Sequence, residues 1–309
     1  MNTLVLTQII GTSVVLFFSL LEALVLQRRK PGTFDWSEAW LSMGDMLGRR
    51  LIALLPLNIA TPVFAWVWQH RLFTLEMNSW LLFALLFVGL EFFYYWYHRA
   101  AHRVRFFWAT HAVHHSPNQL TLSTAFRLGW TGKLTGTTLF FIPLVLVGFS
   151  PQVVLATLSL NLLYQFWLHT TWIPKLGWLE YVLNTPSAHR VHHASNLDYL
   201  DANYGGVLIV FDRLFGTYRE ERAEEPCIYG LVKPMRSHNI FTMEFQQWMD
   251  LWSDMRHTPR WLHKLALIVM PPGWSPNGKS QTTEALRRNG KLAVAPVAPT
   301  LTARTDLPA

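Results

Sequence analysis

The amino-acid sequence predicts an all-α, polytopic integral membrane helical bundle with a cytoplasmic histidine-rich metal site. The composition gives the first indication, because 51% of the 309 residues are hydrophobic and only 15% are charged. A soluble domain carries about 25% charged residues. The second indication is a series of long stretches without Lys or Arg, and the third is a count of 13 histidines against a single cysteine.

The stretches without Lys or Arg are expected to be membrane helices. In chain order they are Leu4–Leu26, Leu51–Trp68, Trp80–Tyr97, Leu134–Phe149 and Val153–Leu168. Eighteen helical residues cover about 27 Å, close to the ~30 Å hydrocarbon core, so the second and third are long enough to cross. The last two are shorter and form a hairpin around 150–152 that either just spans or dips in and returns. The N-terminal stretch lacks a basic region and a cleavage site, which favours a retained helix over a signal peptide.

The basic residues predict the orientation of these helices. If the N-terminus lies outside and all five stretches cross, only Arg71 of the 26 Lys and Arg residues falls on the outer side. Cytoplasmic loops are enriched in Lys and Arg. We therefore expect the histidine motifs to face the cytoplasm, in a bacterial inner membrane or the endoplasmic reticulum.

The C-terminal part of the chain is more polar. Apolar side chains recur at helical spacing from Phe241 to Met255, opposite Glu244, which indicates an amphipathic helix at the membrane interface or one packed on the protein's own core. From Ser275 onward the composition is typical of a disordered tail. The predicted organisation is N-terminal membrane helices at 1–79, a catalytic domain at 80–235, interfacial helices at 236–274 and the tail at 275–309.

The histidines follow a repeated spacing. The groups are His98-x-x-x-His102, His111-x-x-His114-His115, a single His169, and His189-x-x-His192-His193. Positions i, i+3 and i+4 share one face of a helix, so each group can direct its imidazoles at one point. Nine imidazoles exceed the four or so that one zinc takes, which predicts two metals. Imidazole alone does not decide between zinc, copper, iron and nickel.

Other polar residues lie on the same helix faces. The helix that starts at Trp80 is expected to run on through His102. Glu91 precedes His98 by seven residues on the same face and is a candidate catalytic residue, or else a helix acid paired with a neighbouring Arg or Tyr. Asn161 and Gln165 lead to His169, and polar groups at membrane depth usually face a functional interior. The remaining histidines lack ligand spacing and are expected at the surface; they are His70, His238, His257 and His263.

Two acids and two glycines follow the last histidine motif. Asp198 or Asp201 could orient an imidazole through its second nitrogen, although a capping or surface role is favoured. Gly205 and Gly206 indicate a tight turn with a backbone role.

Several classes of protein are excluded by motifs that the sequence lacks. A single Cys227 rules out an internal disulfide and any Cys-ligated zinc or iron–sulfur centre. The H-E-x-x-H, Glu-x-x-His, G-x-S-x-G, P-loop and G-x-G-x-x-G motifs are absent. The basic residues sit beside apolar runs, which suits lipid headgroups, so no nucleic-acid partner is expected.

The order of the histidine motifs resembles the fatty acid hydroxylase and sterol desaturase superfamily of membrane non-haem di-iron enzymes. The resemblance covers about 80–235 and includes the segments 91–102, 108–116 and 184–193. The segments 203–206 and 212–217 are most similar to the alkylglycerol monooxygenase-like branch of that family.

The resemblance implies that all nine clustered histidines bind two irons, and that a lipid (fatty acyl, ether lipid or sterol-like) is hydroxylated with dioxygen. Glu91 falls where the branch has an acidic residue near the site. Ala188 departs from the pattern, since relatives often have histidine there, and Phe211 replaces a common Trp. Desaturation on the same site, a zinc-dependent membrane hydrolase and a non-catalytic metal-binding or lipid-binding protein remain alternatives.

An oxygenase also needs electrons, and the chain shows no motif for a redox cofactor that would deliver them. We expect a separate donor. A basic face with Arg99, Arg103, Arg105 and Arg127 suits an acidic ferredoxin or a cytochrome of the b5 type, or else anionic headgroups. The resemblance implies a reduced pterin instead.

Overall fold

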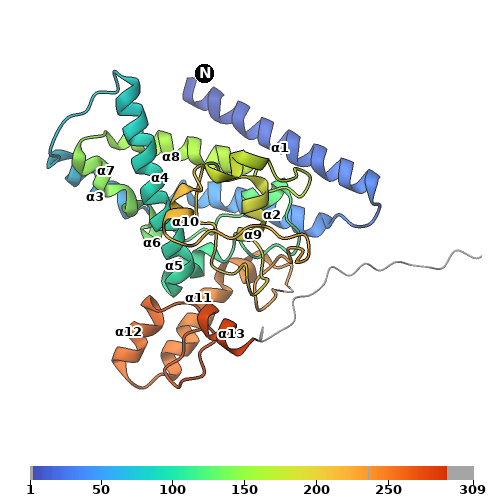
Figure 1. Ribbon diagram of the computed structural model, residues 1–309. Helices are drawn as coiled ribbons and strands as arrows, with labels where there is room; N and C mark the ends of the chain where they lie inside the picture. Colours follow the sequence, from blue (N-terminus) through green and yellow to red (C-terminus); the bar gives the residue numbers. More distant parts are fainter. Residues whose placement is uncertain (1–2, 236, 291–309) are drawn as a thin grey trace, which may run out of the picture.

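The computed structural model describes residues 3–235 and 237–290, with side chains from residue 11 onward (Figure 1). These residues form helices and loops with no β-strand, which confirms the all-helical prediction. Two isolated bridges are present, Leu183 with Leu208 and Ala194 with Tyr229.

The first half of the chain contains the longest helices. They are α1 (Thr3–Arg29), α2 (Trp36–Ile52), α3 (Ala60–Gln69), α4 (Trp80–Arg103), α5 (Arg105–His111), η1 (Leu122–Phe126), α6 (Gly132–Thr135), η2 (Thr137–Phe141) and α7 (Ile142–Val147). The second half has α8 (Pro151–Phe166), η3 (Gly177–Tyr181), α9 (Pro186–His192), α10 (Val210–Leu214), α11 (Ile240–His257), α12 (Trp261–Val269) and α13 (Thr283–Asn289).

Two helices, α1 and α4, are long and apolar enough to cross a membrane by length and composition. The α4 helix begins where Ser79 accepts a hydrogen bond from the backbone N–H of Leu82, at 3.3 Å. It continues past His102 to Arg103, as the sequence predicts. One rigid helix therefore joins the apolar part of the molecule to the first histidines.

The stretch Leu51–Trp68 does not form the single helix that its composition predicts. The α2 helix ends at Ile52, and α3 starts only at Ala60 and has 10 residues. Pro56 lies between them, and proline lacks the backbone N–H that a continuous helix needs. The stretch Leu134–Phe149 is also broken, because Gly136 adopts φ +70° between α6 and η2.

A predicted loop contains a helix that the sequence analysis missed. The α2 helix covers most of 27–50, and Asp35 caps it by accepting hydrogen bonds from the N–H groups of Ser37 and Glu38. Its Ser42 and Asp45 are buried. The segment is rich in charged residues and so did not predict a buried helix. The buried face of α2 is polar and binds polar partners.

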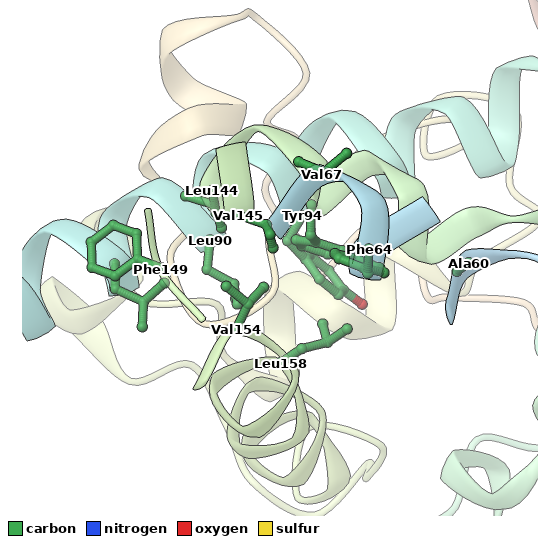
Figure 2. Packing of buried hydrophobic residues seen from close by; sticks show 12 residues of the cluster. Ala60, Phe64, Val67, Leu90, Tyr94, Leu144, Val145, Phe149, Val154 and Leu158 are labelled. Atoms are coloured by element: carbon green, nitrogen blue, oxygen red, sulfur yellow. The ribbon is translucent and has the colours of Figure 1, made fainter. Parts of the chain in front are cut away.

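The main apolar core is formed by α3, α4, η2, α7 and α8 (Figure 2). Leu86, Leu90 and Val145 are fully buried there, and Phe141 and Val154 pack against them. Many apolar side chains on the other faces of α1, α4 and α8 are exposed.

The C-terminal helices α11, α12 and α13 lie together at one end of the molecule, next to α5 (Figure 1). Glu244 on α11 is buried at 1% exposure, which corrects its expected place on the polar face; its carboxylate accepts a hydrogen bond from the Trp130 N–H. Phe241 and Trp252 are exposed.

The disordered tail expected from Ser275 is corrected for 275–290. This segment contains α13, and its Ala285 and Leu286 are buried. Glu284 pairs with Arg103 and Arg287 donates to backbone carbonyls of 197–200, so contacts with distant parts of the chain compensate for the polar composition. The remainder of that expected tail, 291–309, lies outside the described residues.

Candidate metal centre

The structure brings all nine sequence-predicted histidines together. Their ligand atoms form two groups, each with its atoms within 4.8 Å of one another. The first group, called here the five-histidine group, contains His98, His102, His111, His115 and His192. The four-histidine group contains His114, His169, His189 and His193. All are buried except His111, which is half-buried.

Each H-x-x-H-H motif is divided between the two groups. His111 and His115 belong to the five-histidine group, whereas His114 belongs to the four-histidine group. In the last motif His192 alone joins the five-histidine group. In a helical turn, the side chains of residues i and i+4 point in more similar directions than those of residues i and i+3. A single H-x-x-H-H turn can therefore supply ligands to both histidine groups.

Four of the nine imidazoles are held by backbone carbonyls through Nδ1. His98 Nδ1 lies 2.8 Å from the Tyr204 carbonyl oxygen, and His192 Nδ1 lies 2.9 Å from that of Ala202. The remaining two such pairs are His114 Nδ1 with the Arg127 oxygen, at 3.0 Å, and His169 Nδ1 with the Gln165 oxygen, at 2.8 Å. A carbonyl can only accept, so each Nδ1 carries the proton and each Nε2 has a free lone pair.

The free lone pairs face one another. His114 Nε2 and His169 Nε2 are 3.3 Å apart, although the Nδ1 contacts leave both without a proton. Two acceptors at this distance repel unless a cation lies between or beside them. The buried Nε2 atoms of His102, His192 and His193 have no partner among the described residues. The donor set therefore fits a metal, as ligating histidines usually direct the second nitrogen to a carbonyl or carboxylate.

The environment keeps these imidazoles neutral. The pKa values of His115, His192 and His193 lie well below the usual value. The largest cause is burial away from water, and the second is repulsion among neighbouring imidazoles. Burial has the same effect on the pKa of His111, His114 and His189. Neutral imidazole is the form that binds a metal.

Glu91 is buried on α4, seven residues before His98, and its hydrogen bonds go to amides. One carboxylate oxygen accepts from the N–H groups of Val207 and Leu208, each at 2.8 Å, and the other from the Asn161 side chain. The Asn161 side-chain oxygen in turn accepts a hydrogen bond from the Gln165 side chain. The backbone carbonyl of Gln165 is the one that holds His169. Glu91 thus joins α4 to α8 and to the loop after the last histidine motif.

The paired glycines make this loop possible. A Cβ atom on Gly206 would lie 2.3 Å from the Asn161 side-chain nitrogen, and one on Gly205 would lie 2.3 Å from the Leu208 carbonyl oxygen. Asp212 accepts hydrogen bonds from the N–H groups of Tyr204 and Gly205, both at 2.7 Å. Gly206 thus allows the close approach of the loop to α8, and Gly205 allows the tight turn against Leu208 that the sequence predicts.

Asp201 and Asp198 differ in position. Asp201 Oδ1 lies 3.6 Å from His102 Nδ1, and Asp201 Oδ2 is 2.8 Å from Arg103. Burial raises the pKa of Asp201, but His102 and Arg103 together bring it below its usual value. Asp198 instead pairs with Arg222 at the surface. Of the two acids, only Asp201 lies where it can orient a histidine.

Arg127 does not belong to an exposed basic face, which corrects that expectation. Its guanidinium is 1% exposed and donates to the hydroxyls of Ser42 and Ser116, each at 2.9 Å, and to Glu38. Its carbonyl holds His114. Arg105 is paired with Asp254. The sequence carried no signal for these pairings, because the partners are distant in the chain.

The four histidines without ligand spacing lie outside both groups. His70 and His257 are exposed and bind the carbonyls of Trp66 and Ser253. His238 contacts Ser37, and His263 lies near Trp274.

These features define a helical protein with two adjoining groups of mostly buried histidines at the end of a long apolar helix. Residues 83–217 match the family described as fatty acid hydroxylase. All nine clustered histidines fall within that range. The chain therefore contains a domain of the fatty acid hydroxylase family.

Particular relatives agree with this assignment. The chain is 38% identical to alkylglycerol monooxygenase of Homo sapiens over 85% of its own length and 58% of the relative. It is 39% identical to alkylglycerol monooxygenase of Xenopus tropicalis over 73% of its length and 49% of that relative. The ornithine lipid hydroxylase OlsE of Rhizobium tropici is 29% identical over 62% of this chain and 59% of that protein.

The chain thus spans about half the length of the first two relatives. No solved structure matches it significantly.

Proposed function

We propose that this protein is a membrane di-iron monooxygenase that hydroxylates a lipid with dioxygen. The observation that carries the proposal is the convergence of unprotonated Nε2 atoms in two groups, with His114 and His169 as the clearest pair. The relatives named as monooxygenase and hydroxylase support the reaction type.

The two histidine groups would each hold one iron. Bound iron would supply the activation of dioxygen, which amino-acid side chains do not perform. The chain's own contribution is to fix His98, His114, His169 and His192 through their Nδ1 contacts and to keep the centre away from bulk water. Glu91 would act as a positioning residue, since it pins the loop that carries the Tyr204 carbonyl.

The lipid substrate would reach the centre from the bilayer. The α1 and α4 helices have the length and composition to cross it, and α4 leads directly to His98 and His102. The orientation with the histidines on the cytoplasmic side rests on the distribution of Lys and Arg. The relatives' names favour a glycerol ether or an amino-acid lipid over a sterol.

Electrons would come from a separate carrier, since the sequence lacks a binding motif for a nicotinamide, flavin or attached haem. A reduced pterin, a ferredoxin or a cytochrome of the b5 type would meet this need. Desaturation of the lipid is a second candidate because it also needs dioxygen and electrons.

The test is reconstitution of the protein, purified in mild detergent, with iron, an alkylglycerol and a reduced pterin. Metal analysis should give about two irons per chain, and mass spectrometry should show a product heavier by one oxygen atom. A product lighter by two hydrogens would assign desaturation. Turnover without dioxygen or reductant, restored by zinc, would instead establish the zinc-dependent hydrolase.

A further inference from the structure

A polar cavity of about 170 Å³ lies beside the five-histidine group and contains an unusual density of arginines. Arg99 and Arg103 line it from the end of α4, Arg219 from the loop after α10, and Arg287 from α13. Two acids, Asp201 and Glu284, share the lining. Arginine presents several N–H donors in a planar fork, which suits carboxylate and phosphate oxygens.

The acids in this cavity are already used. Arg103 forms ion pairs with both Asp201 and Glu284. Within 3–235 and 237–290, Arg99, Arg219 and Arg287 have no carboxylate within 4.0 Å. The cavity therefore carries an excess of positive charge.

The unpaired arginines also keep free donors. Arg99 donates one hydrogen bond, to the Tyr95 hydroxyl at 3.0 Å. Among the described residues, the Arg219 guanidinium donates one, to the Tyr218 carbonyl at 2.9 Å. A guanidinium has five N–H donors, so most of theirs remain available to a ligand. Arg287, in contrast, anchors the 197–200 loop through three backbone carbonyls.

The inner wall of the cavity is the loop that holds the histidines. Ala202 and Tyr204 line the cavity, and their carbonyls accept from His192 and His98. Asp201 lies against His102. An occupant of the cavity would thus contact the same short segment that orients three members of the five-histidine group.

The shape of the site favours a small group over a protein surface. Arg105 and Arg127, which would have extended a basic face, are neutralised by Asp254 and Glu38. What remains is concave, and a second cavity of about 400 Å³ shares Arg219 and Arg287 with the first. One anionic group fits the first cavity, and the rest of its molecule can extend into the second.

We propose that this cavity is a binding site for an anionic oxygen group, a phosphate or carboxylate, carried by a soluble molecule or by a lipid headgroup. The Arg99 and Arg219 guanidinium groups would bind it, and Arg103 would set the position of the wall through Asp201. This inference concerns binding and does not depend on the proposed oxygenase reaction.

The test measures binding of inorganic phosphate to the full chain in neutral detergent by isothermal titration calorimetry. The double variant Arg99→Gln/Arg219→Gln should bind at least about tenfold more weakly, because two charge-assisted contacts are lost. Arg256→Gln is the matched control, since Arg256 is an exposed arginine outside the cavity. Circular dichroism and metal content report whether each variant folds, and Arg219→Gln alone serves if the double variant does not.

A second arm identifies the source of the anion. Thermal stability is compared in nanodiscs of phosphatidylcholine with and without phosphatidylglycerol, in buffer free of phosphate. Free phosphate is then added to the phosphatidylcholine nanodiscs as a separate comparison. Stabilisation by phosphatidylglycerol that the Arg219→Gln variant loses assigns a lipid headgroup, whereas stabilisation by free phosphate alone assigns a soluble ligand. The proposed site would be overturned if the wild type and the cavity variants responded equally to phosphatidylglycerol and to free phosphate. It would also be overturned if neither protein responded to either ligand.

Discussion

The apolar core and the histidine centre share α4 but are stabilised in different ways. In the core, Leu86 and Leu90 are fully buried in an apolar cluster with residues of α7 and α8, and Figure 2 shows Leu90 among Leu144, Val145 and Val154. At the other end of the helix, His98 and His102 lie among buried polar groups, most of which have a specific partner. The core depends on volume, which several residue types can supply, while the centre depends on individual donors and acceptors.

This difference teaches that one helix can carry both a stability function and a binding function. Changes in the first half of α4 should alter the free energy of unfolding, and changes in its second half should alter metal binding. The following variants test that separation, from the largest expected effect to the smallest.

Removal of a histidine should have the largest effect on function. His114→Ala or His169→Ala should abolish turnover and lower the metal content, because each removes one of four donors in its group. Helix content by circular dichroism should remain close to that of the wild type. His70→Ala and His257→Ala are the controls and should change neither quantity. Full activity of His169→Ala would remove that residue from the centre.

A cavity in the core should have the opposite signature. Leu90→Ala should lower the free energy of unfolding by about 2–5 kcal/mol, the usual cost of truncating a buried leucine. Metal content per folded chain should not change. Leu85→Ala, on an exposed face of α4, is the control and should cost far less. Loss of metal from a fully folded Leu90→Ala variant would show that the two regions are not separate.

Glu91 lies between the two regions and tests the boundary. Glu91→Gln should weaken metal affinity by about 10–100-fold, as expected for a residue that supports the ligands from outside, while the fold persists. Equilibrium dialysis against a chelator measures this affinity. Unchanged metal affinity combined with lost turnover would instead assign Glu91 a direct catalytic role.

A pH titration distinguishes a third type of buried polar contact. Burial is the main cause that raises the pKa of Glu244 well above its ordinary value of 4.5, and the neighbouring Asp45 carboxyl raises it further. Above pH 4.5 the folded state therefore holds a proton that the unfolded state has lost, so stability falls as pH rises until the folded state also releases it. One proton gives a slope of at most about 1.4 kcal/mol per pH unit.

Glu244→Gln should flatten this slope and raise thermal stability above neutral pH, without changing metal content. Urea unfolding between pH 6 and 9 measures the free energy of unfolding at each pH and so gives this slope. An unchanged slope would show that Glu244 does not hold the proton.

The sequence predicted the features that depend on local spacing. The continuation of α4 through His102 and the choice of the nine histidines that meet follow from helical periodicity. Glu91 and Asn161 were expected to share an interior, and a hydrogen bond joins them.

Other features depend on contacts between distant residues and had no local signal. The Nδ1 partners of four histidines are backbone carbonyls, which carry no side-chain identity. Arg127 resembled a surface residue, but Ser42 and Glu38 on α2 bury it. The prediction of one helix over Leu51–Trp68 was wrong, because a hydropathy average does not include the effect of Pro56 on the backbone.

The division of each H-x-x-H-H turn between the two groups has a consequence for how the centre fills. If each group held one ion, a shift of His111 and His115 toward one ion would also move His114, which would serve the other, and the same would hold for His189, His192 and His193. Occupation of one position would therefore prepare the other, and a half-filled state would be disfavoured. Two ions held in this way would enter and leave together, so that stepwise removal by a chelator would follow one sharp, all-or-none transition.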